Sequence, residues 1–179
     1  MPPRVLYDKE AVAGAIARLA QEIVARNPKT KSLALVGVKT RGVYLAERIK
    51  AQVEKEKKVL LAVGAIDTTL YRDDLNDVSH QHQVKGTQIP FDVNEKIIVL
   101  VDDVLYTGRS ARAAIDQIMD FGRPKRIELA VLVDRGHREL PIAPDYVGYK
   151  VETKGDDVVK VHLAEVDGRD EVVVAKQRK

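Results

Sequence analysis

Short apolar runs that alternate with longer amphipathic segments are the feature that most constrains how this chain can fold. Four runs are typical of strands: 33–37, 59–66, 97–101 and 127–133. The run 33–37 has the continuous apolar character of a strand buried on both faces. Helical spacing of apolar residues is found in three other segments: 8–27, 43–53 and 110–121. This order predicts an α/β fold with a mainly parallel central sheet, right-handed crossovers and helices on both faces.

Two segments depart from this alternation. Residues 71–90 are polar and show neither period, and a stretch of that length in a compact domain is usually a functional loop. Residues 145–179 are β-rich, with segments at 146–151, 158–166 and 171–175 separated by turn signals. We expect them to form an antiparallel tail on one edge of the sheet, within a single domain of 179 residues.

The composition excludes several classes of protein. Hydrophobic residues make up 45% and charged residues 32%, as in soluble globular proteins, and the net charge of +3 barely favours nucleic acid as a partner. The chain has no Cys, and therefore no disulfide or thiolate chemistry. With no apolar signal segment at the N-terminus and no run approaching a membrane span, we expect a cytoplasmic protein without a membrane partner.

Two adjacent acids follow the most apolar run. Asp102 and Asp103 come directly after 97–101, and a Thr-Gly-Arg-Ser segment at 107–110 then leads into a helix. Ligands bind at the carboxyl ends of strands in open α/β sheets, and a helix N-terminus offers free N–H groups to an anion. The segment therefore predicts a phosphate-binding loop beside carboxylates that can accept hydrogen bonds from vicinal hydroxyls or hold hydrated Mg²⁺. The alternative is that the acids only cap the helix.

A second anion site is predicted at 37–42, which also joins a strand to a helix. Its two cations, Lys39 and Arg41, suit a diphosphate, whose developing charge they could stabilise as it leaves. Alternatively, both only form salt bridges at the start of the helix. Val43 stands where a nucleotide-triphosphatase loop needs Lys, and Arg112 stands where a nucleophile elbow needs Gly, so neither of those sites is expected.

Residues 99–111 resemble the phosphoribosyl pyrophosphate (PRPP) signature of type I phosphoribosyltransferases, in which two acids hold the ribose hydroxyls and the next loop wraps the 5-phosphate. Residues 39–42 are similar to that family's pyrophosphate loop. The resemblance implies a type I phosphoribosyltransferase fold and Mg²⁺ that arrives with the substrate, with at most water-bridged contacts to the acids. The implied PRPP-binding residues are Lys39, Thr40, Arg41, Gly42, Asp102, Asp103, Tyr106, Thr107, Gly108, Arg109 and Ser110.

Residues 68–75 and 132–142 narrow the resemblance to the bacterial PyrR family, pyrimidine-operon attenuation proteins with uracil phosphoribosyltransferase activity. The match spans nearly the whole chain and weakens after about Ala143. It implies that backbone groups at the end of a strand read uracil, in a pocket formed by Val133, Asp134, Arg135 and His137. His137 as a packed structural residue is the alternative.

The same resemblance implies a reaction in which N1 of uracil displaces pyrophosphate from PRPP and yields UMP, in a homodimer or tetramer. The implied catalytic residues are Asp102, Asp103, Arg41 and Arg72. Arg72 and Lys85 border the polar loop at 71–90, which would exclude water by closing over the substrate. An exposed charged loop is the alternative. His80 and His82 lack a third metal ligand, so no metal is expected there.

RNA binding is the second activity that the resemblance implies, on pyrimidine-operon leader RNA in response to UMP or UTP. Arg18, Arg26 and Arg138 match the family's RNA-binding positions, whereas a solvated helix face is the alternative for the first two. Four positions depart from the family pattern: Ala17, Gln21, Ala143 and Tyr149. Each lost donor or cation weakens phosphate contact. A phosphoribosyltransferase that has lost attenuation, or acts on another nucleobase, is therefore the alternative function.

Overall fold

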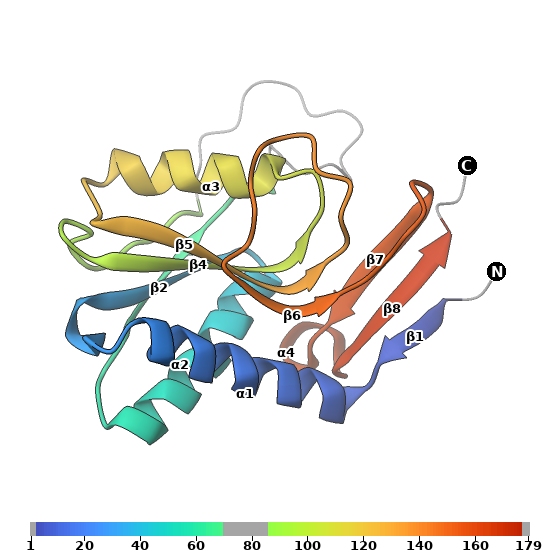
Figure 1. Cartoon of the computed structure of the whole chain (residues 1–179), viewed down its shortest axis with the longest axis horizontal. Coiled ribbons are helices and arrows are strands. Elements are labelled where there is room, and N and C mark those ends of the chain that lie inside the picture. Colours follow the sequence, from blue (N-terminus) through green and yellow to red (C-terminus); the bar gives the residue numbers. More distant parts are fainter. Residues whose placement is uncertain (1–2, 70–85, 177–179) are drawn as a thin grey trace.

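The computed structural model describes residues 3–69 and 86–176, which form two sheets with helices around them (Figure 1). The main sheet has five strands in the order β3 (Ala62–Ile66), β2 (Leu33–Val38), β4 (Ile97–Leu105), β5 (Arg126–Asp134) and β6 (Tyr146–Lys150). All four strand pairings in it are parallel. The smaller sheet is antiparallel, in the order β1 (Arg4–Tyr7), β8 (Glu171–Lys176) and β7 (Asp157–His162). The predicted α/β class is therefore confirmed.

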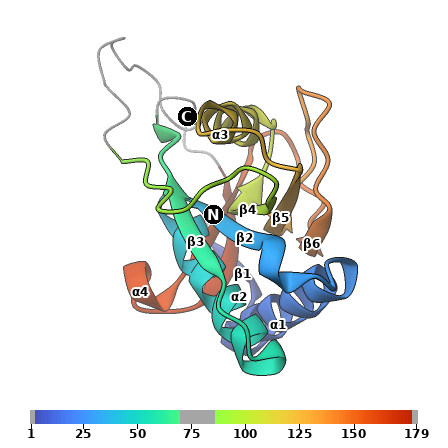
Figure 2. The same ribbon diagram turned by 90° about the vertical axis from the view of Figure 1, so that its left-hand side faces the viewer.

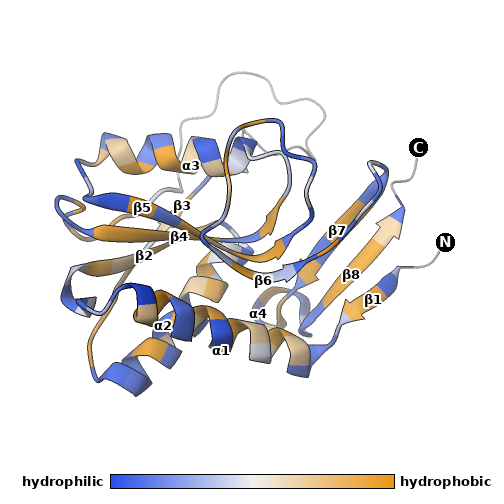
Figure 3. Ribbon diagram, viewed as in Figure 1, coloured by the Kyte–Doolittle hydropathy of each residue, from blue (hydrophilic) through white to orange (hydrophobic). Residues whose placement is uncertain are grey.

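Helices cover both faces of the main sheet, as predicted (Figures 1 and 2). The helices α1 (Lys9–Arg26) and α2 (Arg41–Lys57) lie on one face, and α3 (Arg109–Asp120) lies on the other. Successive strand residues point to opposite faces. In β4, Val99 and Val101 accordingly pack in the core with α1 and α2, whereas Ile98 and Leu100 pack with α3. In Figure 3, hydrophobic colours predominate in β4 and β5, although β5 also has hydrophilic stretches.

The tail differs from the prediction in two respects. The first strand after Pro144, β6, is not antiparallel; it pairs in parallel with β5 and extends the main sheet. The segment predicted as a strand over 158–166 ends at His162, and a short helix, α4 (Ala164–Asp167), follows. The reason is local, because the Asp167 and Asp170 carboxylates accept hydrogen bonds from the Leu163 and Ala164 N–H groups and turn the chain.

The chain ends meet in the smaller sheet. The strand β1, which sequence periodicity did not reveal because it is only four residues long, pairs with β8. Residues 88–90, predicted as part of the structureless stretch, are also tied down, since Gln88 forms an antiparallel bridge with Ala65 of β3. Within the described ranges, no helix has the length and apolar character needed to cross a bilayer.

Candidate active site

The two acids lie inside β4 and not after it, which corrects the predicted end of that strand at Val101. Pairing with β5 continues to Leu105, whereas pairing with β2 stops at Val101. Asp102 is 8% exposed and Asp103 is half-buried, and each carboxylate accepts a hydrogen bond of 2.9 Å from the next backbone N–H. The acids therefore stand on a rigid strand at the carboxyl edge of the sheet, which is the edge where ligands of such folds bind.

The predicted phosphate loop follows at once and opens α3. Gly108 precedes the helix with φ 95°, a left-handed conformation that side chains other than Gly rarely adopt. The buried Thr107 accepts a weak hydrogen bond of 3.3 Å at Oγ1 from the Arg109 N–H. Ser110 lies in the first turn of α3, where backbone N–H groups have no partner within the helix. This geometry fits the expected binding of an anionic ester.

A second loop, 134–142, packs on the phosphate loop. The Arg138 guanidinium donates to the Tyr106 carbonyl at 2.6 Å, to the Ile142 carbonyl at 3.0 Å and to Asp134 Oδ1 at 2.7 Å. The Thr107 carbonyl accepts hydrogen bonds from the Glu139 and Leu140 N–H groups. Arg138, predicted from the resemblance as an RNA contact, therefore joins two site loops.

The residues predicted to bind the base lie at the end of β5 and in this loop. Val133 is fully buried, and the Asp134 carboxylate accepts hydrogen bonds from Gly136 N–H and Arg138. The buried Arg135 guanidinium stacks 4.0 Å from the centre of the Tyr106 ring. His137 Nε2 lies 2.7 Å from the Thr153 carbonyl, which supplies the hydrogen bond of the alternative, but His137 is exposed and not packed in the core.

The predicted pyrophosphate loop lies directly against the acids. A Cβ atom added to Gly42 would come within 2.5 Å of the Val101 carbonyl and 3.3 Å of Asp102 Cα. Only a glycine therefore lets α2 start this close to β4. The Lys39 N–H donates to the Ile66 carbonyl at 2.8 Å, and the Lys39–Thr40 peptide bond is cis. Arg41 is paired with Asp167, which is the salt bridge of the alternative reading.

Sequence reasoning missed a polar group at the end of β3. The pKa of Asp67 is lowered, first by the hydrogen bond from the Thr69 hydroxyl and further by the charge of Lys39. Gln117 of α3 donates to the Asp67 carbonyl and accepts from the Thr87 hydroxyl, which joins residues on either side of 70–85. The signal was available, because Asp67 directly follows an apolar run of the sequence, as Asp102 and Asp134 do.

Some predicted residues lie outside the described residues: Arg72, Lys85, His80 and His82. The other two proposed RNA contacts lie on one side of α1, next to β6. Arg18 donates to the Gly148 carbonyl and lies over the Tyr149 ring. Arg26 pairs with Asp145 at 3.1 Å and lies over the Tyr146 ring, and its side chain is 53% exposed.

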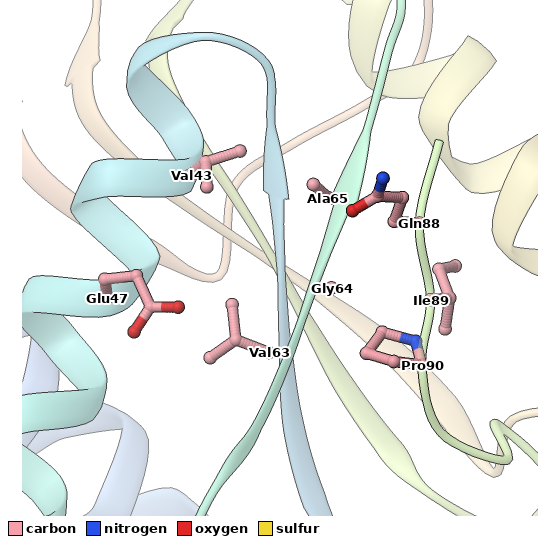
Figure 4. Close-up of a pocket in the computed structure, with 8 residues that line it drawn as sticks. All are labelled: Val43, Glu47, Val63, Gly64, Ala65, Gln88, Ile89 and Pro90. Atoms are coloured by element: carbon pink, nitrogen blue, oxygen red, sulfur yellow. The ribbon is translucent and has the colours of Figure 1, made fainter. Parts of the chain in front are cut away.

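A hollow of about 510 Å³ lies elsewhere, on the outer edge of β3 (Figure 4). It is bordered by Val43 and Glu47 of α2 and by the segment from Gln88 to Pro90. None of the predicted site residues lines it, so we do not assign the chemistry to it.

The comparisons identify the family. A model of the phosphoribosyl transferase domain matches residues 5–167. A bifunctional protein PyrR of Listeria monocytogenes serotype 4b (strain CLIP80459) is 53% identical over 173 residues, which are 95% of this chain and 94% of that protein. A bifunctional protein PyrR of Clostridioides difficile (strain 630) is 53% identical over 169 residues, 94% of this chain and 96% of its own. The chain belongs to the PyrR family of phosphoribosyltransferases.

Solved structures support the fold of this PyrR-family chain. A hypoxanthine-guanine phosphoribosyltransferase of Bacillus anthracis superposes with a TM-score of 0.71 at 16% identity, covering 98% of this chain and 99% of that one. The hypoxanthine phosphoribosyl transferase of Trypanosoma cruzi superposes with a TM-score of 0.73 at 18% identity, covering 97% of this chain and 91% of that one. At such identities the likeness concerns the fold alone, which confirms the predicted type I phosphoribosyltransferase architecture.

The acids of this PyrR-family site suit a magnesium ion that keeps most of its waters. Carboxylate oxygens are ligands that Mg²⁺ prefers, and it is commonly bound by one or two carboxylates together with substrate phosphates. Asp102 and Asp103 supply two carboxylates, and no group of three or more His, Cys, Asp or Glu that could hold a metal occurs within residues 3–69 and 86–176. Two adjacent carboxylates fit an ion that shares its remaining positions with water and substrate phosphates.

Proposed function

We propose that the protein is a uracil phosphoribosyltransferase that converts uracil and PRPP to UMP and pyrophosphate. The single observation that supports this most is the close approach of three elements: the acids of β4, the loop that opens α3 at Gly108 and the start of α2 at Gly42. A phosphate, a diol and a diphosphate are the three polar parts of PRPP, and these elements offer one kind of donor or acceptor for each.

In the proposed mechanism, the chain holds PRPP and lets N1 of uracil approach C1 of the ribose. Asp102 and Asp103 accept hydrogen bonds from the ribose hydroxyls, and Thr107 to Ser110 hold the 5-phosphate. A C1–N1 bond forms, the C1–O bond to pyrophosphate breaks, and the N1 proton passes to water. Most of the rate enhancement then comes from positioning and from preorganised charge. Asp102 and Asp103 would help to hold Mg²⁺ through water beside PRPP, and the ion would supply positive charge to the diphosphate.

The base is read by the end of β5 and the 134–142 loop. Arg138 fixes this loop to the phosphate loop, so the base pocket and the 5-phosphate site keep a constant separation. The Arg135 N–H already donates to the Leu105 carbonyl and the Asp134 carbonyl accepts from the Val151 N–H, so the loop that follows Arg135 would face the edge of uracil. The contact between the 134–142 loop and the phosphate loop matters for catalysis, because misplacement of the reacting atoms by about 1 Å costs on the order of 100-fold in rate.

The decisive experiment incubates the pure protein with Mg²⁺, PRPP and each nucleobase in turn. Formation of UMP from uracil alone is expected. Turnover only with hypoxanthine or guanine would overturn the uracil assignment. The variant Asp102→Asn/Asp103→Ala is expected to lose PRPP affinity at least tenfold, measured by calorimetry, and unchanged affinity would contradict the proposed role of the acids.

We further propose that the protein binds pyrimidine-operon leader RNA in response to UMP or UTP, as a cytoplasmic homodimer or tetramer. Arg18 and Arg26 lie on the same side of α1, and Arg26 keeps half of its side chain exposed despite its pair with Asp145. A gel-shift titration with the leader of its own operon tests this proposal, with and without UMP. Salt-dependent binding that UMP strengthens is expected, and its loss in Arg18→Ala/Arg26→Ala would support the surface.

A further inference from the structure

The C-terminal part of the chain reaches the proposed pyrophosphate loop through one ion pair. Arg41, the first residue of α2, donates from Nε to Asp167 Oδ2 at 3.0 Å and from Nη2 to Asp167 Oδ1 at 2.7 Å. The two residues lie 126 positions apart in the sequence. Two parallel N–H···O bonds between a planar guanidinium and a carboxylate fix both the position and the plane of the arginine.

Asp167 is itself held in place. Its Oδ2 atom accepts a hydrogen bond of 2.9 Å from the Leu163 N–H, at the turn that starts α4. The pKa of Asp167 is lowered, first by the hydrogen bond from Arg41 and also by that from the Leu163 backbone, so the carboxylate is ionised at neutral pH. Leu163 is fully buried. The carboxylate that orients Arg41 is therefore held by the backbone of a core residue.

A neighbouring ion pair anchors α4 independently of Arg41. Arg48, two turns further along α2, binds Glu165 at 2.6 Å and Asp170 at 2.8 Å. Figure 2 shows α4 lying alongside α2. The smaller sheet and α4 are thus fastened to α2 at two points, of which only the pair between Arg41 and Asp167 lies at the pyrophosphate loop.

We propose that Asp167 is a positioning residue, which holds the Arg41 guanidinium ready for the diphosphate of PRPP. This inference rests on the proposed function, in which Arg41 meets the leaving pyrophosphate. A free arginine side chain loses rotamer entropy when it binds a ligand, and the bidentate pair removes that loss before the ligand arrives. The Asp167 carboxylate also offsets part of the guanidinium charge that would attract the diphosphate. Solvent screens this effect, because both side chains are about one-fifth to one-quarter exposed.

The test compares single variants with a double variant. Asp167→Asn is expected to raise the KM for PRPP and the inhibition constant of pyrophosphate about fivefold to tenfold, with the KM for uracil within about twofold of the wild type. Asp167→Glu, which restores the charge, is expected to recover part of this loss. Because Asp167 acts through Arg41, Arg41→Ala/Asp167→Asn is expected to match Arg41→Ala alone.

Glu165→Gln is the matched control, because it weakens the other ion pair of α4 and leaves the Arg41 pair intact. It is expected to leave the KM for PRPP unchanged, and thermal unfolding of every variant separates a positioning effect from loss of fold. Unchanged or lower KM for PRPP in Asp167→Asn would overturn the proposal, as would additive losses in the double variant. A wild-type protein without PRPP-dependent turnover would instead overturn the proposed function on which the proposal rests.

Discussion

Arg138 and Arg112 each pair with an aspartate four residues away, but only Arg138 is enclosed. Its side chain is 21% exposed and makes hydrogen bonds to Asp134 and to the carbonyls of Tyr106 and Ile142. Arg112 lies on the surface of α3, and its side chain and that of Asp116 are more than half exposed. A charged group buried with its acceptors contributes far more than an exposed ion pair, because its loss leaves those acceptors without a partner.

Arg138→Ala is therefore expected to lower the free energy of unfolding by about 2 kcal/mol and to raise the KM for both PRPP and uracil. The kinetic effect follows from the two loops that Arg138 joins. Arg112→Ala is the control and is expected to change stability by less than about 0.5 kcal/mol, with normal kinetics. Urea unfolding and initial rates measure both. Equal effects of the two substitutions would show that the contacts of Arg138 do not organise the site.

For individual residues, the sequence predicted which ones lie close together at the candidate site, but not which hydrogen bonds and ion pairs hold them there. The apolar run before Asp102 and the Gly108 turn placed the acids and the phosphate loop at one edge, because strand ends of a parallel sheet meet there. The pair of Arg41 with Asp167 had no such signal. It joins residues 126 positions apart, and only the packing of the smaller sheet determines it.

Among the elements, the start of α2 depends on a glycine. The Cβ of an alanine at position 42 would lie 2.5 Å from the Val101 carbonyl, which is backbone and cannot turn away. Gly42→Ala is expected to destabilise the fold by about 1–3 kcal/mol and to weaken PRPP binding, since α2 must move away from Asp102. Differential scanning calorimetry and PRPP titration measure these two effects.

Gly14→Ala is the matched control for that prediction. Gly14 lies within α1, and an added Cβ would meet no atom within 4 Å. Since alanine favours a helix over glycine, this variant is expected to gain about 0.5–1 kcal/mol. The test is therefore whether the two substitutions change the free energy of unfolding in opposite directions. A neutral Gly42→Ala variant would show that α2 and β4 can separate without loss.

A buried polar group joins α1 to β5 and β6 at the edge opposite the candidate site. Glu128, 3% exposed, accepts hydrogen bonds from Asn27 at 2.8 Å, from the Tyr146 hydroxyl at 2.7 Å and from Arg126 at 2.7 Å. Burial by itself would raise the pKa of Glu128, but these hydrogen bonds outweigh burial and the pKa is lowered. Glu128 is therefore ionised in the folded protein.

A group whose folded pKa is depressed stabilises the fold above its unfolded pKa, here near 4.5, and this stabilisation is lost as the pH falls through the folded value. Glu128→Gln is accordingly expected to be less stable than the wild type at neutral pH by about 1–3 kcal/mol, with a gap that narrows below pH 4.5. Urea titrations across this range measure it. Glu22→Gln, an exposed change on α1, is the control, and a gap independent of pH would contradict the prediction.

The periodicity of apolar residues predicted the long helices and strands but not the short ones, β1 and α4. Asp8 accepts a hydrogen bond from the Ala11 N–H at the start of α1, where the helical segment predicted over 8–27 begins. The strand β6 was assigned the wrong direction because its five residues show no pattern that distinguishes parallel from antiparallel pairing. The connection between β5 and β6 brings the chain back alongside Ala130, where β6 begins and runs parallel to β5.

For the whole molecule, the question is whether the two sheets fold as one unit. One hydrophobic cluster spans both: Val159, Val161, Leu163 and Val172 of the smaller sheet and its α4 turn pack with residues of α1, α2 and the main sheet. The ion pairs of Arg41 and Arg48 reinforce this contact at its polar rim. A shared core predicts a single cooperative transition, because neither sheet buries its apolar face alone.

Leu163→Ala tests this prediction, since Leu163 is fully buried at the junction. Removing it leaves a cavity, and the free energy of unfolding is expected to fall by about 2–5 kcal/mol in one transition seen equally by far-UV and near-UV circular dichroism. Leu60→Ala is the control: Leu60 is 92% exposed, and its removal is expected to change stability by less than about 0.5 kcal/mol. Two separate transitions in Leu163→Ala would mean that the smaller sheet unfolds by itself, and the hold of Asp167 on Arg41 would then depend on a part of the molecule that opens first.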